Sequence, residues 1–198
     1  AARTKLLSPP QLLDWFDQRL TLLSEGAVNA PDRHQSLREA ISWSYHLLAP
    51  DEQRLFRRLG VFAGGFSVEA ATAVAAEPSA EERAASDDPS AAQLATLAKL
   101  AALIDQSLLR TSGTSEPRFN MLATIREYAL EQLAAAQESD ALRRRHAAFF
   151  LELAEAAAPQ LSGPHQMSWL DRIEAEHANL RAALGYCIEA EDASREVG

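Results

Sequence analysis

The sequence is poor in the residues on which several protein classes depend. It has a single cysteine, Cys187, which excludes an intramolecular disulfide framework and is typical of a reducing, cytoplasmic environment. No segment approaches the roughly 18 consecutive apolar residues of a membrane-spanning helix, so no membrane role is expected. Glycine is also scarce, at 8 of 198 residues, which favours helices over a β-rich fold.

Clusters of positive charge are missing as well. The net charge is −9, and residues 61–110 and 159–198 each carry 3 basic against 7 acidic groups. DNA binding depends mainly on phosphate neutralisation by clustered Lys and Arg. The only basic runs are Arg57–Arg58 and Arg143–Arg145, and we expect them to form solvated faces or interdomain salt bridges. The composition therefore disfavours direct DNA binding.

No constellation of catalytic or metal-binding residues is present. The chain lacks a G-x-x-x-x-G-K-[ST] phosphate loop, and we expect Gly64–Gly65 to end a helix. The five histidines are scattered and show no metal-ligand spacing. Cys187 has no neighbouring Lys or Arg to activate its thiol, so a small core residue is expected there. These observations predict a non-enzymatic chain without catalytic residues, cofactor or metal.

What the sequence does contain is apolar periodicity typical of helices. A helix is expected over residues 9–24 and a loop over 26–34. Ser36 and Glu39 form an S-x-x-E capping box, which predicts a helix beginning at Ser36. Its buried stripe is expected to contain Leu37, Ile41, Tyr45 and Leu48, with a second buried face at Trp43 and Leu47.

The next helices carry clearer boundary signals. Pro50, followed by two acidic residues, predicts a helix start, and the core face of this helix contains Leu55, Phe56 and Leu59. Ser67 is expected to cap an alanine-rich helix over 68–76. Residues 77–91 are acidic and rich in Ser and Ala, which predicts a flexible insertion. Beyond it, a fourth helix is expected to bury Leu94, Leu97, Leu100 or Ala101, and Ile104.

A β-hairpin and a helical tail are expected to follow. Residues 107–111 and 118–122 flank a turn-forming stretch, as hairpin strands do. Thr124 and Glu127 form a second capping box, and the inward residues of its helix are expected to be Ile125, Tyr128, Ala129 and Leu133. Two or three helices are expected over 139–190, the first ending before Pro159. Their inward positions are expected to be Leu142, Phe149, Phe150, Leu153, Trp169, Leu170, Ile173, Leu180 and Leu184.

Four segments in a fixed order carry a family resemblance: RHQSLREAISWSYHLL (33–48), LFRRLGVFAGGFSVEAA (55–71), LIDQSLLRT (103–111) and RFNMLATIREYALEQL (118–133). Together they resemble the winged-helix segment of the large bacterial signal-transduction ATPases with numerous domains. These include transcriptional regulators that carry LuxR-type or OmpR-like DNA-binding domains.

The resemblance implies a mainly α fold, in which a winged helix with a small β-hairpin is followed by tetratricopeptide-like antiparallel helices. It assigns residues 1–30 to the end of an upstream helical domain and residues 31–137 to the winged helix, with the insertion near 77–91. Residues 138–198 are assigned to the start of the helical repeats, which are expected to continue beyond the chain.

The same resemblance implies a regulatory role inside a larger ATPase. In the family, the winged helix generally folds back against the nucleotide-binding domain and holds the ADP-bound form closed. Related ATPases carry a Met-His-Asp motif after the hairpin, and the matching stretch here is Met121–Leu122–Ala123. Because leucine can neither donate to nor accept from a phosphate, this departure argues against direct nucleotide contact and leaves mechanical coupling.

We therefore expect a non-catalytic fragment that couples a helical array, sensing a small-molecule or protein inducer, to the nucleotide-binding domain of the same parent chain. The ATP-binding motifs are expected upstream. The candidate interdomain contacts are Trp43, Phe66, Leu122 and Arg126. Two alternatives stay open: a winged-helix DNA-binding domain, and a stand-alone protein-interaction scaffold.

Overall fold

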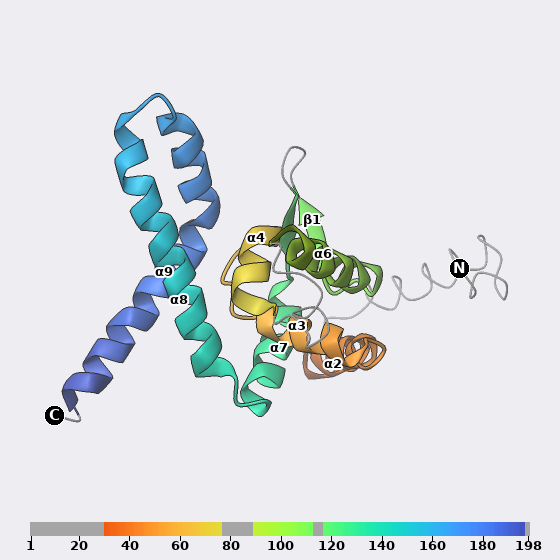
Figure 1. Cartoon of the computed structure of the whole chain (residues 1–198). Coiled ribbons are helices and arrows are strands. Elements are labelled where there is room, and N and C mark those ends of the chain that lie inside the picture. Colours follow the sequence, from red (N-terminus) through yellow and green to blue (C-terminus); the bar gives the residue numbers. More distant parts are fainter. Residues whose placement is uncertain (1–29, 77–88, 113–116, 197–198) are drawn as a thin grey trace. The chain divides into compact units, whose positions relative to one another are not determined.

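The described part of the chain is mainly helical, with one two-stranded antiparallel sheet (Figure 1). The computed structural model describes residues 30–76, 89–112 and 117–196, with side chains described within 36–76, 90–112 and 117–191. The elements, which include a π-helix (η1) and a 3-10 helix (η2), are in chain order α2 (Ala30–His46), α3 (Pro50–Leu59), α4 (Val68–Ala70), η1 (Ala71–Ala75), α6 (Pro89–Asp105), β1 (Arg110–Ser112), β2 (Arg118–Asn120), α7 (Ala123–Ala135), α8 (Ser139–Ala157), η2 (Ala158–Ser162) and α9 (Gln166–Glu196).

The chain divides into two units, Ala1–Leu37 and Arg38–Gly198, and the packing described below belongs to the second. The helix expected over 9–24 lies outside the described residues, as does the upstream domain expected over 1–30, apart from residue 30. Most of the expected insertion also lies outside them, because α6 already begins at Pro89. Among the described helices, none combines the length and the apolar character that crossing a membrane requires.

The first described helix starts earlier than the sequence predicts. α2 begins at Ala30, so Ser36 lies inside the helix. The capping box expected at Ser36 and Glu39 is therefore wrong, and residues 30–34 are helical where a loop was expected.

Only one face of α2 is buried. Tyr45 packs its ring against Phe56 and Tyr128, with centroids 5.4 and 5.7 Å away. Ile41 and Leu48 are buried on the same side, as expected. Three side chains that were expected to be buried are exposed instead: Leu37 at 45%, Trp43 at 62% and Leu47 at 47%. The second buried face predicted for this helix is wrong, because the core meets α2 from one direction.

The boundary signals of the next two helices are confirmed. α3 begins at Pro50, and the carboxylate of Glu52 accepts the backbone N–H of Ala49 at 2.8 Å. Its predicted core face, Leu55, Phe56 and Leu59, is buried. Ser67 caps α4, because its Oγ accepts the backbone N–H of Ala70 at 3.1 Å. The helix expected over 68–76 continues from α4 into the π-helical turn η1.

α6 buries a different face from the one that the sequence predicts. Thr96, Leu100 and Leu103 are buried, whereas Leu94 and Leu97 are 67% and 41% exposed. The sequence of α6 is rich in alanine and leucine on several of its sides, so two overlapping apolar stripes could face the core. The expected burial of Leu94 and Leu97 is therefore wrong, and that of Leu100 is confirmed.

The predicted hairpin is confirmed, and a third segment is bonded to it. In the register of β1 and β2, Thr111 lies opposite Phe119. Phe119 also forms an isolated antiparallel bridge with Phe66, in which each backbone N–H donates to the other residue's carbonyl, at 2.8 and 2.9 Å. The wing is thereby fixed to the segment that follows α3.

α7 begins at Ala123. Its N-cap residue is Leu122, which forms no side-chain hydrogen bond to the helix. The capping box predicted at Thr124 and Glu127 is therefore wrong, since both residues lie inside the helix. The predicted inward face is confirmed, because the buried residues of α7 are Ile125, Tyr128, Ala129 and Leu133.

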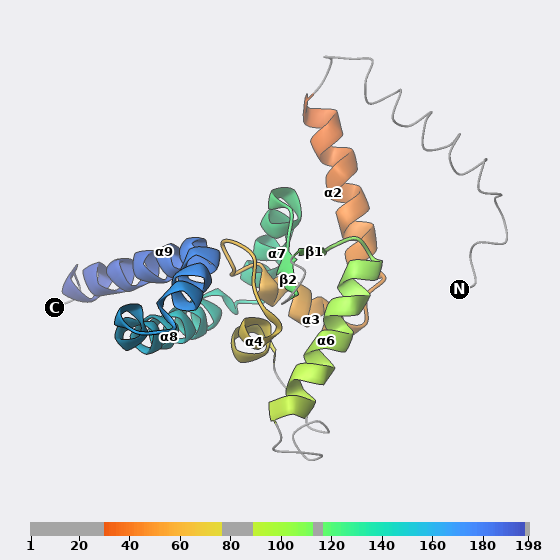
Figure 2. The same ribbon diagram turned by 90° about the horizontal axis from the view of Figure 1, so that it is seen from above.

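α8 and α9 form an antiparallel hairpin and lie side by side in both views (Figures 1 and 2). α8 ends at Ala157, before Pro159, as expected. The helices expected around Trp169 and around Leu180 are one continuous helix of 31 residues. The side chains of Leu170, Leu184 and Cys187 are exposed, so their expected inward positions are wrong.

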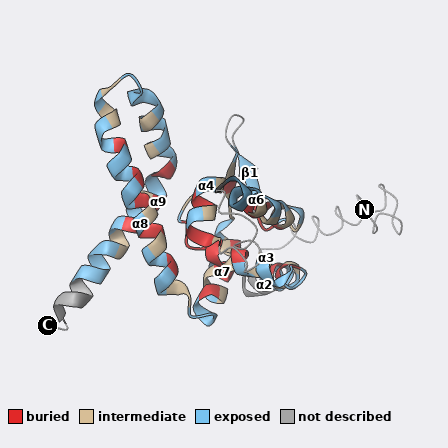
Figure 3. Cartoon of the chain, in the orientation of Figure 1, coloured by how far each residue is buried: buried red, intermediate tan, exposed pale blue. Residues whose placement is uncertain are grey.

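The core extends from the winged helix into the hairpin. Buried residues gather on the facing sides of α3, α4 and α7 (Figure 3). An aromatic series crosses this region: the Phe62 and Phe66 rings stack at 4.7 Å, and Phe66 stacks on Phe119 at 6.0 Å. Phe150 of α8 lies 6.3 Å from Phe62, so α8 contributes directly to the same core.

Candidate coupling interface

The α8–α9 hairpin meets the winged helix through a set of buried or half-buried polar contacts. The residues of this set, which we call the junction, are the loop 62–66, Arg118, Arg126, His146, Glu176 and Asn179. The loop leads from α3 to α4, Arg118 belongs to the wing and Arg126 to α7. His146 lies on α8, and Glu176 and Asn179 lie one turn apart on α9.

Asn179 satisfies three backbone groups of the loop. Its side chain is fully buried, at 0% exposed. Its Oδ1 accepts the N–H of Ala63 at 2.9 Å and of Gly64 at 3.3 Å, and its Nδ2 donates to the carbonyl of Gly65 at 2.9 Å. A buried backbone group without a partner costs about 1–3 kcal/mol. The hairpin thus completes the hydrogen bonding of the winged helix.

The glycine pair permits this close approach. A Cβ on Gly64 would lie 3.1 Å from the Cβ of Ala178, and a Cβ on Gly65 would lie 2.5 Å from Oδ1 of Asn120. The second distance is shorter than real Cβ contacts allow. Gly64–Gly65 was expected to end a helix, and this expectation is wrong, because α3 already ends at Leu59 with Gly60 as its C-cap. The pair lies instead in the loop, where side chains of α9 and the wing approach the backbone closely.

Glu176 binds the wing to α9. Its side chain is buried, and Arg118 donates from Nη1 to Glu176 Oε1 at 2.7 Å. The second nitrogen, Nη2, donates to the carbonyls of Gly65 and Ala175 at 2.9 and 3.1 Å. Glu176 Oε2 accepts from Asn179 at 2.8 Å, so the two side chains form one network. Because both the carboxylate and the guanidinium are satisfied, this pair has the geometry that a buried charge requires.

Arg126 extends from α7 to the same loop. Its Nε donates to the carbonyl of Phe62 at 2.6 Å. Burial lowers the pKa of this guanidinium, because the charged form is partly removed from water. Within the described part of the chain no carboxylate lies in ion-pair distance of Arg126, so its positive charge is not neutralised there.

His146 is the buried titratable group of the junction. It is 3% exposed, and its ring contacts Phe62 and Phe150, with centroids 5.5 and 4.6 Å away. Its Nε2 is buried without a hydrogen-bond partner in the described structure. The pKa of His146 is lowered to about 4, mainly because the ring is buried; hydrogen bonding to Asn179 raises it and the charge of Arg126 lowers it. The imidazole is therefore neutral near pH 7.

The two basic runs of the sequence supply structural contacts. Arg57 and Arg58 both bind the carboxylate of Glu138, at 2.9 and 2.8 Å. Burial opposes ionisation of Glu138, but the hydrogen bonds and charges of the two arginines outweigh it and lower its pKa to about 2. Arg145 donates to the carbonyls of Ala73 and Ala76 at 2.9 and 3.1 Å, at the end of η1.

The four candidate contacts predicted from the sequence lie in different environments. Trp43 and Leu122 are 62% and 43% exposed, on α2 and at the start of α7. Phe66 is 1% exposed and belongs to the core. Arg126 is part of the junction, and Phe66 is the last residue of the junction loop. The structure does not bring the four together, and their role as interdomain contacts stays a prediction.

Sequence reasoning missed the two most connected residues, Glu176 and Asn179. Both are polar, whereas the expected inward positions of this segment were all apolar. A signal existed in their spacing, because Glu176, Asn179 and Ala183 recur at three and four residues, as one helical face does. Among the described residues, no group of three or more His, Cys, Asp or Glu could hold a metal ion. The junction is suited to holding elements together.

Replacing Asn179 with alanine is expected to destabilise the chain by about 2–4 kcal/mol, because the N–H groups of Ala63 and Gly64 lose their partner and the bond to Glu176 is lost. Urea unfolding measures this change. The matched control is Asn120→Ala, whose side chain bonds Ser112 at an exposed position and is expected to cost less than about 1 kcal/mol. Equal stabilities of the two variants would contradict the assignment of the junction.

The free energy of unfolding is expected to fall as the pH falls from about 6.5 to about 4. The pKa of His146 is lower in the folded chain, so the unfolded chain binds the proton first. The full difference corresponds to roughly 3 kcal/mol. Urea unfolding at a series of pH values across this range measures how steeply the free energy of unfolding falls with pH. This fall should be shallower for His146→Gln and unchanged for His177→Gln, which replaces an exposed histidine on α9. Parallel profiles for wild type and His146→Gln would contradict this. Protonation of Glu138 lowers the free energy of unfolding as well, but only below about pH 4.5.

Residues 48–134 match the sequence family described as "Winged helix-turn-helix domain". The matched segment extends from just before α3 to the last turn of α7 and includes both strands of the wing. No solved structure gives a significant match to the chain.

The chain also matches much longer proteins. A Mycobacterium tuberculosis protein named "Putative HTH-type transcriptional regulator" is 38% identical over 191 residues, which cover 96% of this chain and 20% of the relative. A Mycobacterium bovis protein with the same description gives the same values. An "Uncharacterized protein" of Mycobacterium tuberculosis is 34% identical over 147 residues, covering 74% of this chain and 35% of the relative. The chain thus spans about a fifth of the length of the first relatives. Residues 48–134 are therefore a winged helix-turn-helix domain, in a chain homologous to proteins named as HTH-type transcriptional regulators.

Proposed function

We propose that this chain is a non-catalytic regulatory part of a cytoplasmic transcriptional regulator, and that its winged helix docks on another domain of the same protein. The α8–α9 hairpin forms the base of a helical sensing array, and the junction transmits the position of that array to the winged helix. The observation that carries the proposal is the apolar exposed face of α6.

α6 occupies the position of a recognition helix. In a helix-turn-helix motif the second helix enters the DNA groove, where its side chains reach phosphates and base edges. Here α4 and η1 precede α6, so α6 is that second helix. Its only basic residue, Lys99, is paired with Asp51 at 3.5 Å. The groups that would contact phosphates are therefore scarce on this helix.

The exposed face of α6 is apolar instead. Leu94 is 67% exposed and Leu97 is 41% exposed, and the exposed alanines beside them are Ala91, Ala98 and Ala101. Contiguous apolar surface of this kind marks protein contacts more often than nucleic-acid contacts. This face supports a protein partner.

The wing offers little positive charge in its described residues. Arg118 is bound to Glu176, and Arg110 of β1 is the exposed cation that remains in the described strands. Since DNA affinity grows with the number of neutralised phosphates, one free arginine gives a weak electrostatic basis for DNA binding.

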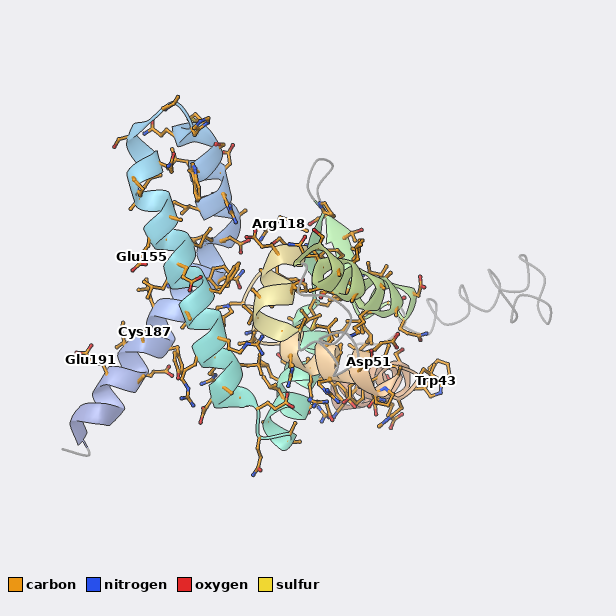
Figure 4. All side chains as sticks on the ribbon, in the orientation of Figure 1. Trp43, Asp51, Arg118, Glu155, Cys187 and Glu191 are labelled. Carbon is orange, nitrogen blue, oxygen red and sulfur yellow. The ribbon has the colours of Figure 1, made fainter. Side chains whose placement is uncertain are left out.

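Trp43 provides a second exposed apolar group. It is 62% exposed, and Figure 4 shows it projecting away from the ribbon of α2. Tryptophan is enriched at the centres of protein interfaces because one side chain buries a large area. Trp43 is the predicted contact that best fits a second docking point.

The partner that we propose is the nucleotide-binding domain of the same parent chain. The support is the resemblance to signal-transduction ATPases, in which the winged helix generally folds back on that domain. The inducer, a protein or a small molecule, would act at the helical repeats that continue the α8–α9 hairpin. A switch of this kind requires that the winged helix bind two states of its partner unequally.

DNA binding is the second candidate function. It is favoured by the match of residues 48–134 to the winged helix-turn-helix domain and by relatives named as HTH-type transcriptional regulators. Arg110 would then contact a phosphate. A fold of this type serves several functions, so the fold alone does not decide between the two candidates.

The double variant Leu94→Glu, Leu97→Glu is expected to weaken binding to the separately expressed nucleotide-binding domain by about tenfold or more, because two apolar contacts are replaced by charges. Isothermal titration with the ADP-loaded and ATP-analogue-loaded domain measures this effect, and tighter binding to the ADP form is expected. Folding should be unaffected, since both leucines are exposed.

The control is Leu151→Glu, which changes a leucine on α8 that is 56% exposed. It should bind like the wild type. Unchanged binding by the α6 double variant would remove α6 as the docking face, and equal binding to both nucleotide states would remove the switch.

The chain is expected to bind a mixed-sequence DNA duplex only weakly at about 150 mM salt, and Arg110→Ala to change that affinity less than about twofold. Fluorescence anisotropy across a series of salt concentrations measures both. Tight binding, with an affinity that falls steeply as salt rises and is lost in Arg110→Ala, would establish the DNA-binding candidate instead.

A further inference from the structure

A cavity of about 400 Å³ lies between α7, α8 and α9, beside the junction. This volume falls within the range of small-molecule sites in proteins. Its walls are partly apolar, with Val61, Leu130 and Leu133 contributing side chains. The rest of the lining is mixed and comes from all three helices, so a bound molecule would contact the winged helix and the hairpin at once. Its polar side chains are those of Arg126, Ser139, Arg143, His146, Tyr186 and Glu189.

Two arginines line the cavity, and neither forms an ion pair among the residues whose side chains the structure describes. Arg126 is half-buried and its recorded hydrogen bond uses only Nε, toward Phe62. Arg143 comes from α8 on the opposite side. Within the described residues neither guanidinium lies in ion-pair distance of a carboxylate, although Glu189 also lines the cavity. The partly desolvated charge of Arg126 is therefore uncompensated, as in sites that receive an anion from outside.

A buried, unsatisfied polar atom lies in the same wall. His146 lines the cavity, is 3% exposed, and leaves its Nε2 without a hydrogen-bond partner in the described structure. Buried side-chain polar atoms are nearly always paired, so Nε2 of His146 is a group at the cavity that can still take a hydrogen-bond partner.

Gly185 keeps the cavity open. It lies inside the 31-residue helix α9 and lines the cavity. A Cβ built on it meets nothing within 4 Å, so no neighbouring atom requires a glycine there. Glycine is the poorest helix former apart from proline. A larger side chain at this position would fill part of the cavity.

We propose that this cavity binds a small organic anion, whose carboxylate or phosphate group is held by Arg126 and Arg143 and whose apolar part lies against Val61, Leu130 and Leu133. Nε2 of His146 accepts a hydrogen bond from the ligand or from a water bound with it. Because Arg126 belongs to the winged helix and Arg143 to the hairpin, the bound anion stabilises the docked hairpin. The inference does not depend on which partner the winged helix contacts.

The test uses the whole chain and two probes, sodium phosphate and sodium benzoate, each titrated calorimetrically against chloride at constant ionic strength. Saturable binding at millimolar concentrations and a higher unfolding temperature are expected for at least one probe. A response to phosphate alone indicates a phosphate head group, and a response to benzoate alone indicates a carboxylate with an apolar body. Failure of both probes to bind saturably would overturn the proposal.

Variants locate the binding in the cavity. Arg143→Gln is expected to weaken binding about tenfold by removing a charge-assisted hydrogen bond. The matched control, Arg144→Gln, changes the adjacent exposed arginine, which does not line the cavity, and should leave affinity unchanged. Glu189→Gln should strengthen binding by removing a like charge. Equal effects of the two arginine variants would place the anion elsewhere.

Gly185→Leu fills the cavity from α9 while leaving every charge in place. It is expected to abolish binding of both probes and to keep or raise the unfolding temperature, since leucine is a better helix former than glycine. This variant separates loss of the site from loss of folding. Binding of the probes to Gly185→Leu with wild-type affinity would overturn the proposal.

Discussion

The buried amide of Asn179 is the interaction on which the arrangement of this chain depends. The loop that leaves α3 cannot satisfy its own backbone at residues 63–65, because it belongs to neither a helix nor a strand there, and Asn179 supplies both a donor and an acceptor. On either side of that loop lie Phe62 and Phe66, which stack on each other and carry the core toward α8 and the wing. The hairpin is therefore part of the domain's hydrogen bonding as well as its packing.

A polar junction has consequences that an apolar one would not. Buried networks such as Arg118–Glu176–Asn179 are favourable only when every member is paired, so they specify one arrangement and tolerate little displacement. A change in the angle of the hairpin would break several hydrogen bonds together. Such an interface suits the transmission of a position, which is the role that we propose, and the adjacent cavity gives a ligand access to it.

Much of the fold follows from local signals. Pro50 and Ser67 begin helices because their chemistry acts within one turn, and α7 buries the four residues that its periodicity selects. The wrong expectations have two causes. In α6 two apolar stripes could face the core, and in α2 and α7 a capping-box pattern occurs inside a helix that begins earlier. α6 is apolar on several sides, so spacing placed both Leu97 and Leu100 inward, whereas the core buries Leu100 and leaves Leu97 exposed. The exposed stripe that remains, with Leu94 and Leu97, is the feature on which our proposal of a protein partner rests.

The sequence by itself determined the helical composition, the hairpin, the order of elements and the absence of a P-loop, because these depend on residue type and spacing along the chain. Only the tertiary structure decided the junction. Arg118 and Glu176 are 58 residues apart, and Asn179 is 116 residues from Ala63. Polar residues in a helix ordinarily face water. Only the approach of the α3–α4 loop, with backbone groups that lack partners, makes burial of Asn179 favourable.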